Sequence, residues 1–133
     1  SNKGKEIKNN KNVSLNFLWK DIERQIIIEG VTKKISEVSS INYFNKRPRD
    51  SQISAWVSDQ SKKLKNKIVL ENQYKKIIKK FEKMDTIPKP TYWGGYIVIP
   101  NKIEFWQGKK SRLHDRICYK LINKNWKKFR LSP

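Results

Sequence analysis

The sequence contains very little cysteine, histidine or methionine, and it has no long hydrophobic run. Its 133 residues include one Cys, one His, one Met and five Gly. A single cysteine cannot form an internal disulfide, and one histidine with one cysteine makes no ligand cluster for a metal ion. Without a run of about 18 apolar residues, or an apolar core in the polar segment 1–12, we expect neither a transmembrane helix nor a signal peptide. The protein is therefore expected to be cytoplasmic, with Cys118 as a small buried residue.

The short motifs of several enzyme classes are also lacking. The sequence has no G-x-S-x-G nucleophile elbow and no phosphate-loop pattern. The glycine pair Gly94-Gly95 lacks the rest of a nucleotide fingerprint. We expect it to allow close packing at the start of a strand.

Positive charge is abundant: the formal net charge is +19 and the calculated pI is about 10.1. Such a charge alone favours a polyanionic partner. However, the basic residues are 25 Lys and only 6 Arg, spread along the chain, whereas specific phosphate and base recognition favours Arg. We interpret them as a solvated surface and expect no specific nucleic acid. A basic nucleic-acid-binding module remains an alternative.

The length suits one domain with one hydrophobic core. Alternating and β-branched segments predict antiparallel strands at the start of the chain, whereas apolar residues recur at helical spacing in the middle. Start signals at Ser36 and Asp50 mark two helices, and apolar residues at steps of three and four mark a third. The expected strands are 13–19, 21–36, 92–99, 102–107, 112–121 and 126–131, and the expected helices are 36–46, 51–58 and 66–84. This order predicts an α+β fold with an antiparallel sheet, in the form of a small barrel.

A first candidate site lies in the segment 112–116, Arg-Leu-His-Asp-Arg. On a strand, Arg112, His114 and Arg116 would share one face. Two guanidinium groups beside an imidazole would bind an anion there. A hairpin with the segment 103–108 would bring Trp106 close as a stacking surface. Solvent-facing residues of an edge strand are the alternative interpretation.

A second candidate is the segment 43–51, where a helix end, a proline turn and a new helix start meet. Exposed amides at a helix N-terminus bind phosphate. Tyr43, Arg47 and Ser51 could donate hydrogen bonds to the same phosphate group. A structural capping role is equally compatible with this pattern.

Taken in order, the motifs of the chain resemble the pyridoxamine 5′-phosphate oxidase family. The matching segments are Glu23-Arg24-Gln25, the run 47–53 (RPRDSQI), Ala55-Trp56, Gln60-Ser61, Pro88-x-Pro90, Trp93-Gly94-Gly95, the run 104–108 (EFWQG), the run 112–116 (RLHDR) and the final RLSP at 130–133. The resemblance covers essentially the whole chain and corresponds to the C-terminal two-thirds of the family's sequence. The family's first strands have no counterpart here, and Asn2 stands where the family usually has Arg.

The resemblance implies a single domain, residues 1–133, with an antiparallel split β-barrel of the FMN-binding type, flanking helices, and the C-terminal dimerisation region of a homodimer. The implied FMN contacts are Lys3, Gln25, Gln60, Ser61, Trp106 and Arg116. The implied contacts to the vitamin B6 phosphate are Tyr43, Arg47, Ser51, Arg112, Leu113 and His114, of which Arg112 and His114 would be catalytic.

The implied reaction is oxidation of pyridoxine or pyridoxamine 5′-phosphate to pyridoxal 5′-phosphate. A hydride would pass from C4′ of the substrate to N5 of FMN, and dioxygen would reoxidise the flavin, giving hydrogen peroxide. In this scheme the protein mainly positions the substrate while the flavin carries the electrons. A protein of the same fold that binds B6 phosphate or flavin without turnover is the alternative.

Overall fold

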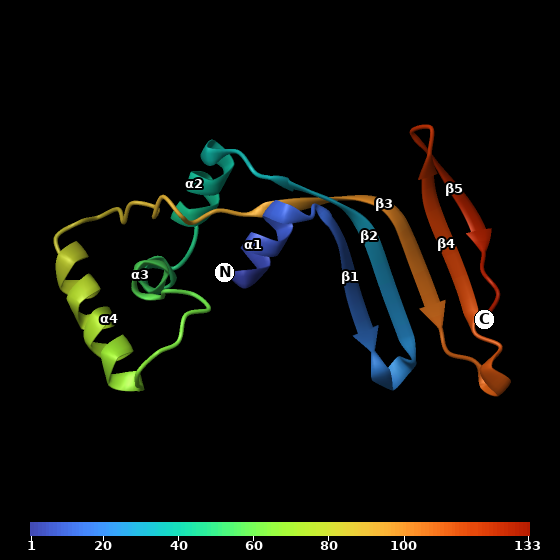
Figure 1. The fold of residues 1–133 in the computed structure, drawn as a ribbon, viewed down its shortest axis with the longest axis horizontal. Helices are drawn as coiled ribbons and strands as arrows, with labels where there is room; N and C mark the ends of the chain where they lie inside the picture. The colour runs from blue at the N-terminus through green and yellow to red at the C-terminus, as the bar shows by residue number, and fades with distance from the viewer. The chain divides into compact units, whose positions relative to one another are not determined.

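After a short N-terminal helix, strands flank a helical middle segment, in the order that the sequence predicts for residues 12–133 (Figure 1). The computed structural model describes residues 1–133. The elements are α1 (Asn2–Asn9), β1 (Asn12–Trp19), β2 (Arg24–Lys34), α2 (Glu37–Asn45), α3 (Arg49–Val57), α4 (Lys67–Phe81), β3 (Tyr96–Gln107), β4 (Asp115–Ile122) and β5 (Asn125–Arg130), with 3₁₀ turns η1 (Lys20–Ile22) and η2 (Lys110–Arg112). None of the helices combines the length and the apolar character needed to cross a membrane.

The residues form two compact units, which are described separately. The helical unit contains Ser1–Lys3 and Lys34–Tyr96, and the sheet unit contains Gly4–Lys33 and Ile97–Pro133. The helical unit includes α2, α3 and α4, whereas the strands belong to the sheet unit apart from two boundary residues.

The sheet unit is an open antiparallel sheet in the order β1-β2-β3-β4-β5. The β1–β2 pairing runs from Asn12 opposite Val31 to Trp19 opposite Arg24. The β4–β5 hairpin turns at Asn123 and Lys124, which both have positive φ. Two such residues in succession match the twist of the flanking strands, so the hairpin is tight. The predicted antiparallel α+β fold is confirmed.

One long strand, β3, replaces the two strands predicted at 92–99 and 102–107. Pro100 lies in the gap between the two predicted strands, and proline cannot donate to a sheet ladder. In the structure β4 pairs with β3 only from Lys102 onward. One side of β3 therefore has no strand partner at Pro100, and proline is accommodated there. The pair Gly94-Gly95 lies just before β3, as expected, and a Cβ on Gly95 would come within 3.1 Å of the Ile35 side chain.

Strands β2 and β3 approach closely at Gly30, which is buried. A Cβ at this position would lie 2.9 Å from Cα of Pro100 and closer still to the carbonyl oxygen of Ile99. Both are backbone atoms, so relief requires the strands to separate. Gly30→Ala is expected to lower the free energy of unfolding by roughly 2–3 kcal/mol, the scale of overpacking a dense site.

The measurement is urea unfolding followed by circular dichroism. Gly94→Ala is the matched control, because its added Cβ would find nothing nearer than Oγ of Ser40 at 3.7 Å. If both variants unfold at the wild-type urea concentration, the close approach at Gly30 is not a constraint on the fold.

The helical unit has its own apolar core. The buried side chains are Phe44, Ile53, Val57, Phe81 and Ile87, contributed by α2, α3, α4 and the connector that follows α4. Ser36 and Asn66 cap α2 and α4, each accepting a hydrogen bond from a backbone N–H three residues later. The predicted cap at Asp50 is wrong: α3 begins earlier, at Arg49, and Asp50 lies in its first turn. Pro48 immediately precedes the helix, a position that its fixed φ favours.

Helix α1 was not among the predicted elements. Residues 2–9 are mostly polar, so no apolar periodicity marks a helix there. Lys3, an implied flavin contact, lies exposed on this helix.

Candidate functional site

Three of the predicted flavin contacts form a row across the sheet unit. Trp106 on β3 is directly opposite Arg116 on β4. On the other side of β3, the side chain of Arg24 donates to Gln107 with a 2.7 Å hydrogen bond. Because neighbouring residues of a strand face opposite sides, Gln25 and Trp106 both face away from that pair. Gln25, Trp106 and Arg116 therefore share one face of three adjacent strands.

The hydrogen bonds of this row leave donors and acceptors available. The Gln25 amide nitrogen donates to Asn16 at 2.9 Å, which fixes the side chain and leaves its oxygen as an acceptor. Nε of Arg116 donates to Glu104 at 2.7 Å, and Nη1 donates to the Ser132 carbonyl at 2.8 Å. The bond to Glu104 raises the pKa of Arg116 further, so the guanidinium stays charged. The row combines a flat indole with a fixed cation and an amide.

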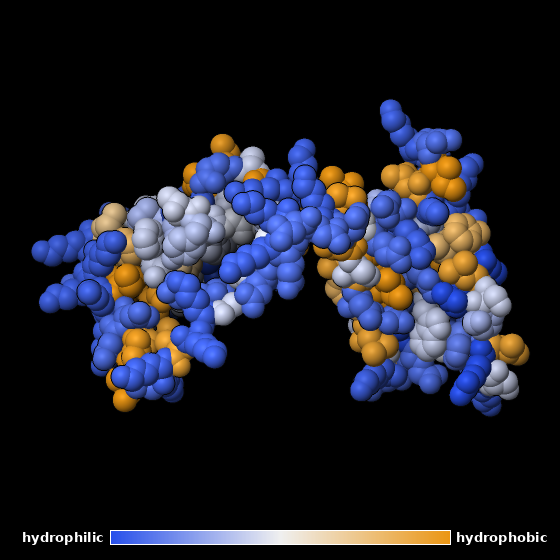
Figure 2. Space-filling model, in the orientation of Figure 1, coloured by the Kyte–Doolittle hydropathy of each residue, from blue (hydrophilic) through white to orange (hydrophobic).

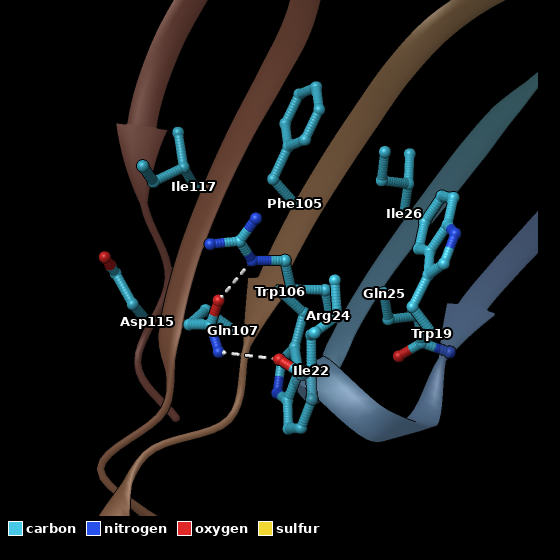
Figure 3. Close-up of a pocket in the computed structure, with 10 residues that line it drawn as sticks. All are labelled: Trp19, Ile22, Arg24, Gln25, Ile26, Phe105, Trp106, Gln107, Asp115 and Ile117. Atoms are coloured by element: carbon cyan, nitrogen blue, oxygen red, sulfur yellow. Dashed lines mark hydrogen bonds between the residues drawn. The ribbon is translucent and has the colours of Figure 1, made fainter.

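A pocket of about 410 Å³ opens at the end of the sheet where β1 and β3 end and β2 and β4 begin (Figure 3). Figure 3 shows Ile26, Phe105 and Ile117 rising side by side from β2, β3 and β4. Arg24 and Gln107 form the polar part of the wall. The full lining is Trp19, Ile22, Arg24, Gln25, Ile26, Phe105, Trp106, Gln107, Asp115 and Ile117. The pocket is mostly apolar with a few convergent polar groups, and its volume is typical of small-molecule sites.

The segment 112–116 is not one strand. This corrects the prediction that Arg112, His114 and Arg116 share one face as alternate residues of a strand. Strand β4 begins only at Asp115. Ser111 and Arg112 adopt left-handed backbone conformations in the 3₁₀ turn that precedes it. The period-two rule applies only to extended chain, so it does not place Arg112. Arg112 and Leu113 are both exposed in the structure.

His114 is nevertheless beside Trp106, as predicted. The two ring centroids are 4.8 Å apart. The backbone N–H of Lys109 donates to Nδ1 of His114 at 3.2 Å. Because that nitrogen accepts, a neutral ring carries its proton on Nε2. In that form His114 presents a single N–H donor, on a ring tilted by 44° to that of Trp106.

In the helical unit, Tyr43 and Arg47 each contact the ring of Trp93. The Tyr43 and Trp93 rings are stacked with centroids 6.1 Å apart, and Cζ of Arg47 lies 5.3 Å from the Trp93 centroid. Nη1 of Arg47 is buried and has no hydrogen-bond partner. A buried cationic donor without an acceptor is costly, so this atom is placed to receive a hydrogen-bond acceptor such as a water or an anionic ligand.

The two arginines of Arg47-Pro48-Arg49 have different roles. Nη2 of Arg49 donates to the Phe81 carbonyl at 2.7 Å, and its Nη1 donates to the Met84 carbonyl at 2.9 Å. Arg49 thus caps the C-terminal end of α4. Ser51 is half-buried in the first turn of α3, beside the helix N-terminus that follows Arg47. Arg47 comes just before the N-terminus of α3 and Ser51 lies in its first turn, and their joint contact with a phosphate remains a prediction.

Sequence reasoning missed the residues that hold Trp93 in place. Lys89 is buried, with its side chain 3% exposed, and pairs with Glu37 at 2.9 Å. It also donates to the carbonyl oxygens of Trp93 at 2.8 Å and Pro90 at 3.1 Å. In a chain with 25 lysines, only its place between two prolines distinguishes this buried one in the sequence.

The remaining predicted flavin contacts are not in the sheet row. Gln60 and Ser61 belong to the helical unit, in an exposed turn after α3 where Ser61 has positive φ. Lys3 is grouped with the same unit. Their assignment to the flavin remains a prediction.

The family model described as pyridoxamine 5′-phosphate oxidase matches residues 1–81. The chain belongs to the pyridoxamine 5′-phosphate oxidase family. A second model, described as the pyridoxine 5′-phosphate oxidase C-terminal dimerisation region, matches residues 93–133.

Curated relatives of this family are similar along the whole chain. The pyridoxine/pyridoxamine 5′-phosphate oxidase 2 of Hydrogenovibrio crunogenus is 50% identical over 133 residues. The corresponding oxidase of Leptospira biflexa serovar Patoc is also 50% identical over 133 residues. In both cases the match covers 100% of this chain but 62% of the relative.

Solved structures support the same fold. PhzG from Burkholderia lata, crystallised in complex with tetrahydrophenazine-1-carboxylic acid, is 26% identical with a TM-score of 0.88. The match covers all of this chain and 64% of PhzG. A pyridoxamine 5′-phosphate oxidase-related, FMN binding protein from Nostoc punctiforme has a TM-score of 0.73 at 12% identity, over 100% of this chain and 69% of its own, and shows the fold alone. The expected family and fold are thus confirmed.

Proposed function

We propose that this chain binds FMN and a vitamin B6 5′-phosphate and acts in the oxidation of pyridoxine or pyridoxamine 5′-phosphate to pyridoxal 5′-phosphate. The observation that carries the proposal is the buried, unpaired Nη1 of Arg47. Arg47 and Tyr43 both contact the Trp93 ring, and Arg47 comes just before the N-terminus of α3. A guanidinium, a phenol and a helix N-terminus are groups that suit a phosphate.

The sheet row fits the chemistry of FMN. The indole of Trp106 can lie against a flat ring, Arg116 supplies a fixed positive charge, and the Gln25 amide oxygen can accept a hydrogen bond. We assign these three residues to flavin binding, with Lys3, Gln60 and Ser61 as further contacts implied by the family resemblance.

The chain's own residues would bind and align the substrate. Arg47, Tyr43 and Ser51 hold the phosphate, and this binding energy restricts the ring to a reactive orientation. His114 offers its Nε2 proton to the ring, and Arg112 and Leu113 lie on the same turn. Bound FMN would supply the redox chemistry, a two-electron oxidation of the substrate at C4′ in which the two electrons and two protons removed would end on dioxygen as hydrogen peroxide.

We also propose a homodimer. Leu15, Phe17 and Trp19 alternate on β1 and share one face of the sheet unit, where they are 37%, 45% and 46% exposed. Figure 2 shows apolar residues gathered over the strands of this unit. Exposed apolar patches of this kind mark association surfaces, and a dimerisation-region model matches residues 93–133. Sedimentation of the purified chain as a monomer at micromolar concentration would contradict this proposal.

The functional test is aerobic turnover. The purified chain is mixed with FMN and pyridoxine 5′-phosphate, and pyridoxal 5′-phosphate and hydrogen peroxide are measured. Formation of both in equal amounts supports the proposal. If the chain binds both ligands but forms no product, it is a binding protein of the same fold. If RNA displaces the B6 phosphate with a steep salt dependence, the basic-module alternative is correct.

A further inference from the structure

The sheet unit contains one buried carboxylate, Glu104, that the proposed function does not use. Its side chain is 7% exposed, and it faces the same side of the sheet as Trp106 and Arg116. An ionised carboxylate is expensive to bury unless it is paired. Its partner is Nε of Arg116, at 2.7 Å.

Arg116 is held at three points. Besides the bond to Glu104, its Nη1 donates to the Ser132 carbonyl at 2.8 Å. Its own carbonyl accepts from the backbone N–H of Leu131 at 3.0 Å, so the C-terminal segment lies along β4 at this residue. Nε and Nη1 are thereby engaged within the protein, and Nη2 is left to donate outward. The Arg116 side chain remains 31% exposed.

This arrangement differs from the other ion pair on the same sheet face. Lys102 and Glu29 are 2.9 Å apart, and the cations of the two pairs are similarly exposed, but the Glu29 side chain is 46% exposed where that of Glu104 is 7% exposed. Such exposed pairs contribute little to stability. Burying a carboxylate beneath an arginine is also a poor source of stability, because desolvation offsets the attraction. Its clearest effect is to fix the direction of the guanidinium, which lies opposite Trp106.

We propose that Glu104 is a positioning residue for flavin binding, acting through Arg116: it orients the guanidinium so that Nη2 meets the cofactor beside Trp106. This inference rests on the proposed function, because it takes Arg116 as a flavin contact. Glu104 itself need not touch the flavin. Its effect on FMN affinity should therefore exist only when Arg116 is present.

The test is a double-mutant cycle on FMN affinity, measured by quenching of flavin fluorescence, with thermal unfolding recorded for each protein. Glu104→Gln is expected to weaken FMN binding about tenfold in the wild-type background. In the Arg116→Ala background the same substitution is expected to change affinity by less than twofold. The matched control is Glu29→Gln, which removes the other carboxylate of an ion pair on this face and should leave FMN affinity within twofold of wild type.

Two results overturn the inference alone: FMN affinity of Glu104→Gln equal to wild type, or the same loss with and without Arg116. The second would mean that Glu104 acts through general stability. If Glu104→Gln does not fold, Glu104→Asp takes its place in the cycle, because it keeps the charge but moves it away from Nε. Failure of the wild-type chain to bind FMN overturns the proposed function together with this inference, so the two failures are distinguishable.

Discussion

Replacing Arg47 with alanine is expected to weaken the binding of pyridoxine 5′-phosphate about 100-fold, because hydrogen bonds to charged groups contribute roughly 1.5–3 kcal/mol each. Arg47 carries the buried, unpaired donor of the helical unit, and its guanidinium is already placed on the Trp93 ring. The bond to the phosphate therefore needs little ordering of the side chain on binding. Calorimetric titration with pyridoxine 5′-phosphate measures the effect.

Lys46→Ala is the matched control for this prediction. Lys46 is the neighbouring cation, it is exposed, and its removal changes the net charge by the same amount. If charge alone attracts the ligand, the two variants should bind equally weakly. We expect Lys46→Ala to bind within about twofold of wild type, as is usual for exposed charges. Equal losses in both variants would contradict the assignment of Arg47.

Replacing His114 with asparagine is expected to slow substrate oxidation about 100-fold, the lower range for loss of a positioned proton donor or acceptor. The side-chain oxygen of Asn can still accept from the N–H of Lys109, as Nδ1 of His114 does at 3.2 Å. The turn that carries Arg112 is then retained, while the Nε2 donor is lost. Single-turnover flavin reduction measures this step without product release.

A second substitution separates the two nitrogens of His114. The longer side chain of Gln reaches the position of Nε2 but loses the acceptor near the backbone. His114→Gln is expected to recover part of the rate that His114→Asn loses. Wild-type rates in both variants would exclude a role for His114 in the reaction. A wild-type rate in His114→Asn with a loss in His114→Gln would assign its importance to the turn.

Much of the fold could be predicted from sequence, because the relevant signals are local. The cap residue Ser36 and the apolar spacing of α4 each depend on a few neighbouring residues. The strand that crosses Pro100 could not be predicted, because proline ends a strand only where the sheet needs a backbone N–H donor at that position. Whether it is needed depends on where β4 begins to pair, and this is tertiary information.

The candidate sites were predictable in composition but not in detail. Arg47 and Arg49 look alike in the sequence, yet one holds an unpaired donor and the other caps α4. Only the position of the Phe81 and Met84 carbonyls separates them. In the same way, the turn at Ser111 and Arg112 rests on left-handed backbone at two residues other than glycine, which is uncommon and has no sequence signal here.

The supporting residues were the least predictable. Glu104 and Lys89 belong to residue types that are rarely buried without partners. Glu104 is buried with Arg116 of the adjacent strand as its partner. Lys89 is buried with three oxygen atoms as partners, from Glu37, Pro90 and Trp93. Family resemblance pointed to the segments that contain them but assigned them no role.

The most direct test of the central claim is anaerobic flavin reduction by a phosphorylated substrate. The chain is loaded with FMN under exclusion of oxygen, and absorbance near 450 nm, roughly where oxidised flavin absorbs, is followed after adding pyridoxine 5′-phosphate or pyridoxine. We expect rapid bleaching with the phosphate ester and little with free pyridoxine, because Arg47 binds the phosphate. Stoichiometric FMN binding with no bleaching by either compound would contradict the oxidase function, and equal bleaching by both would contradict the phosphate site.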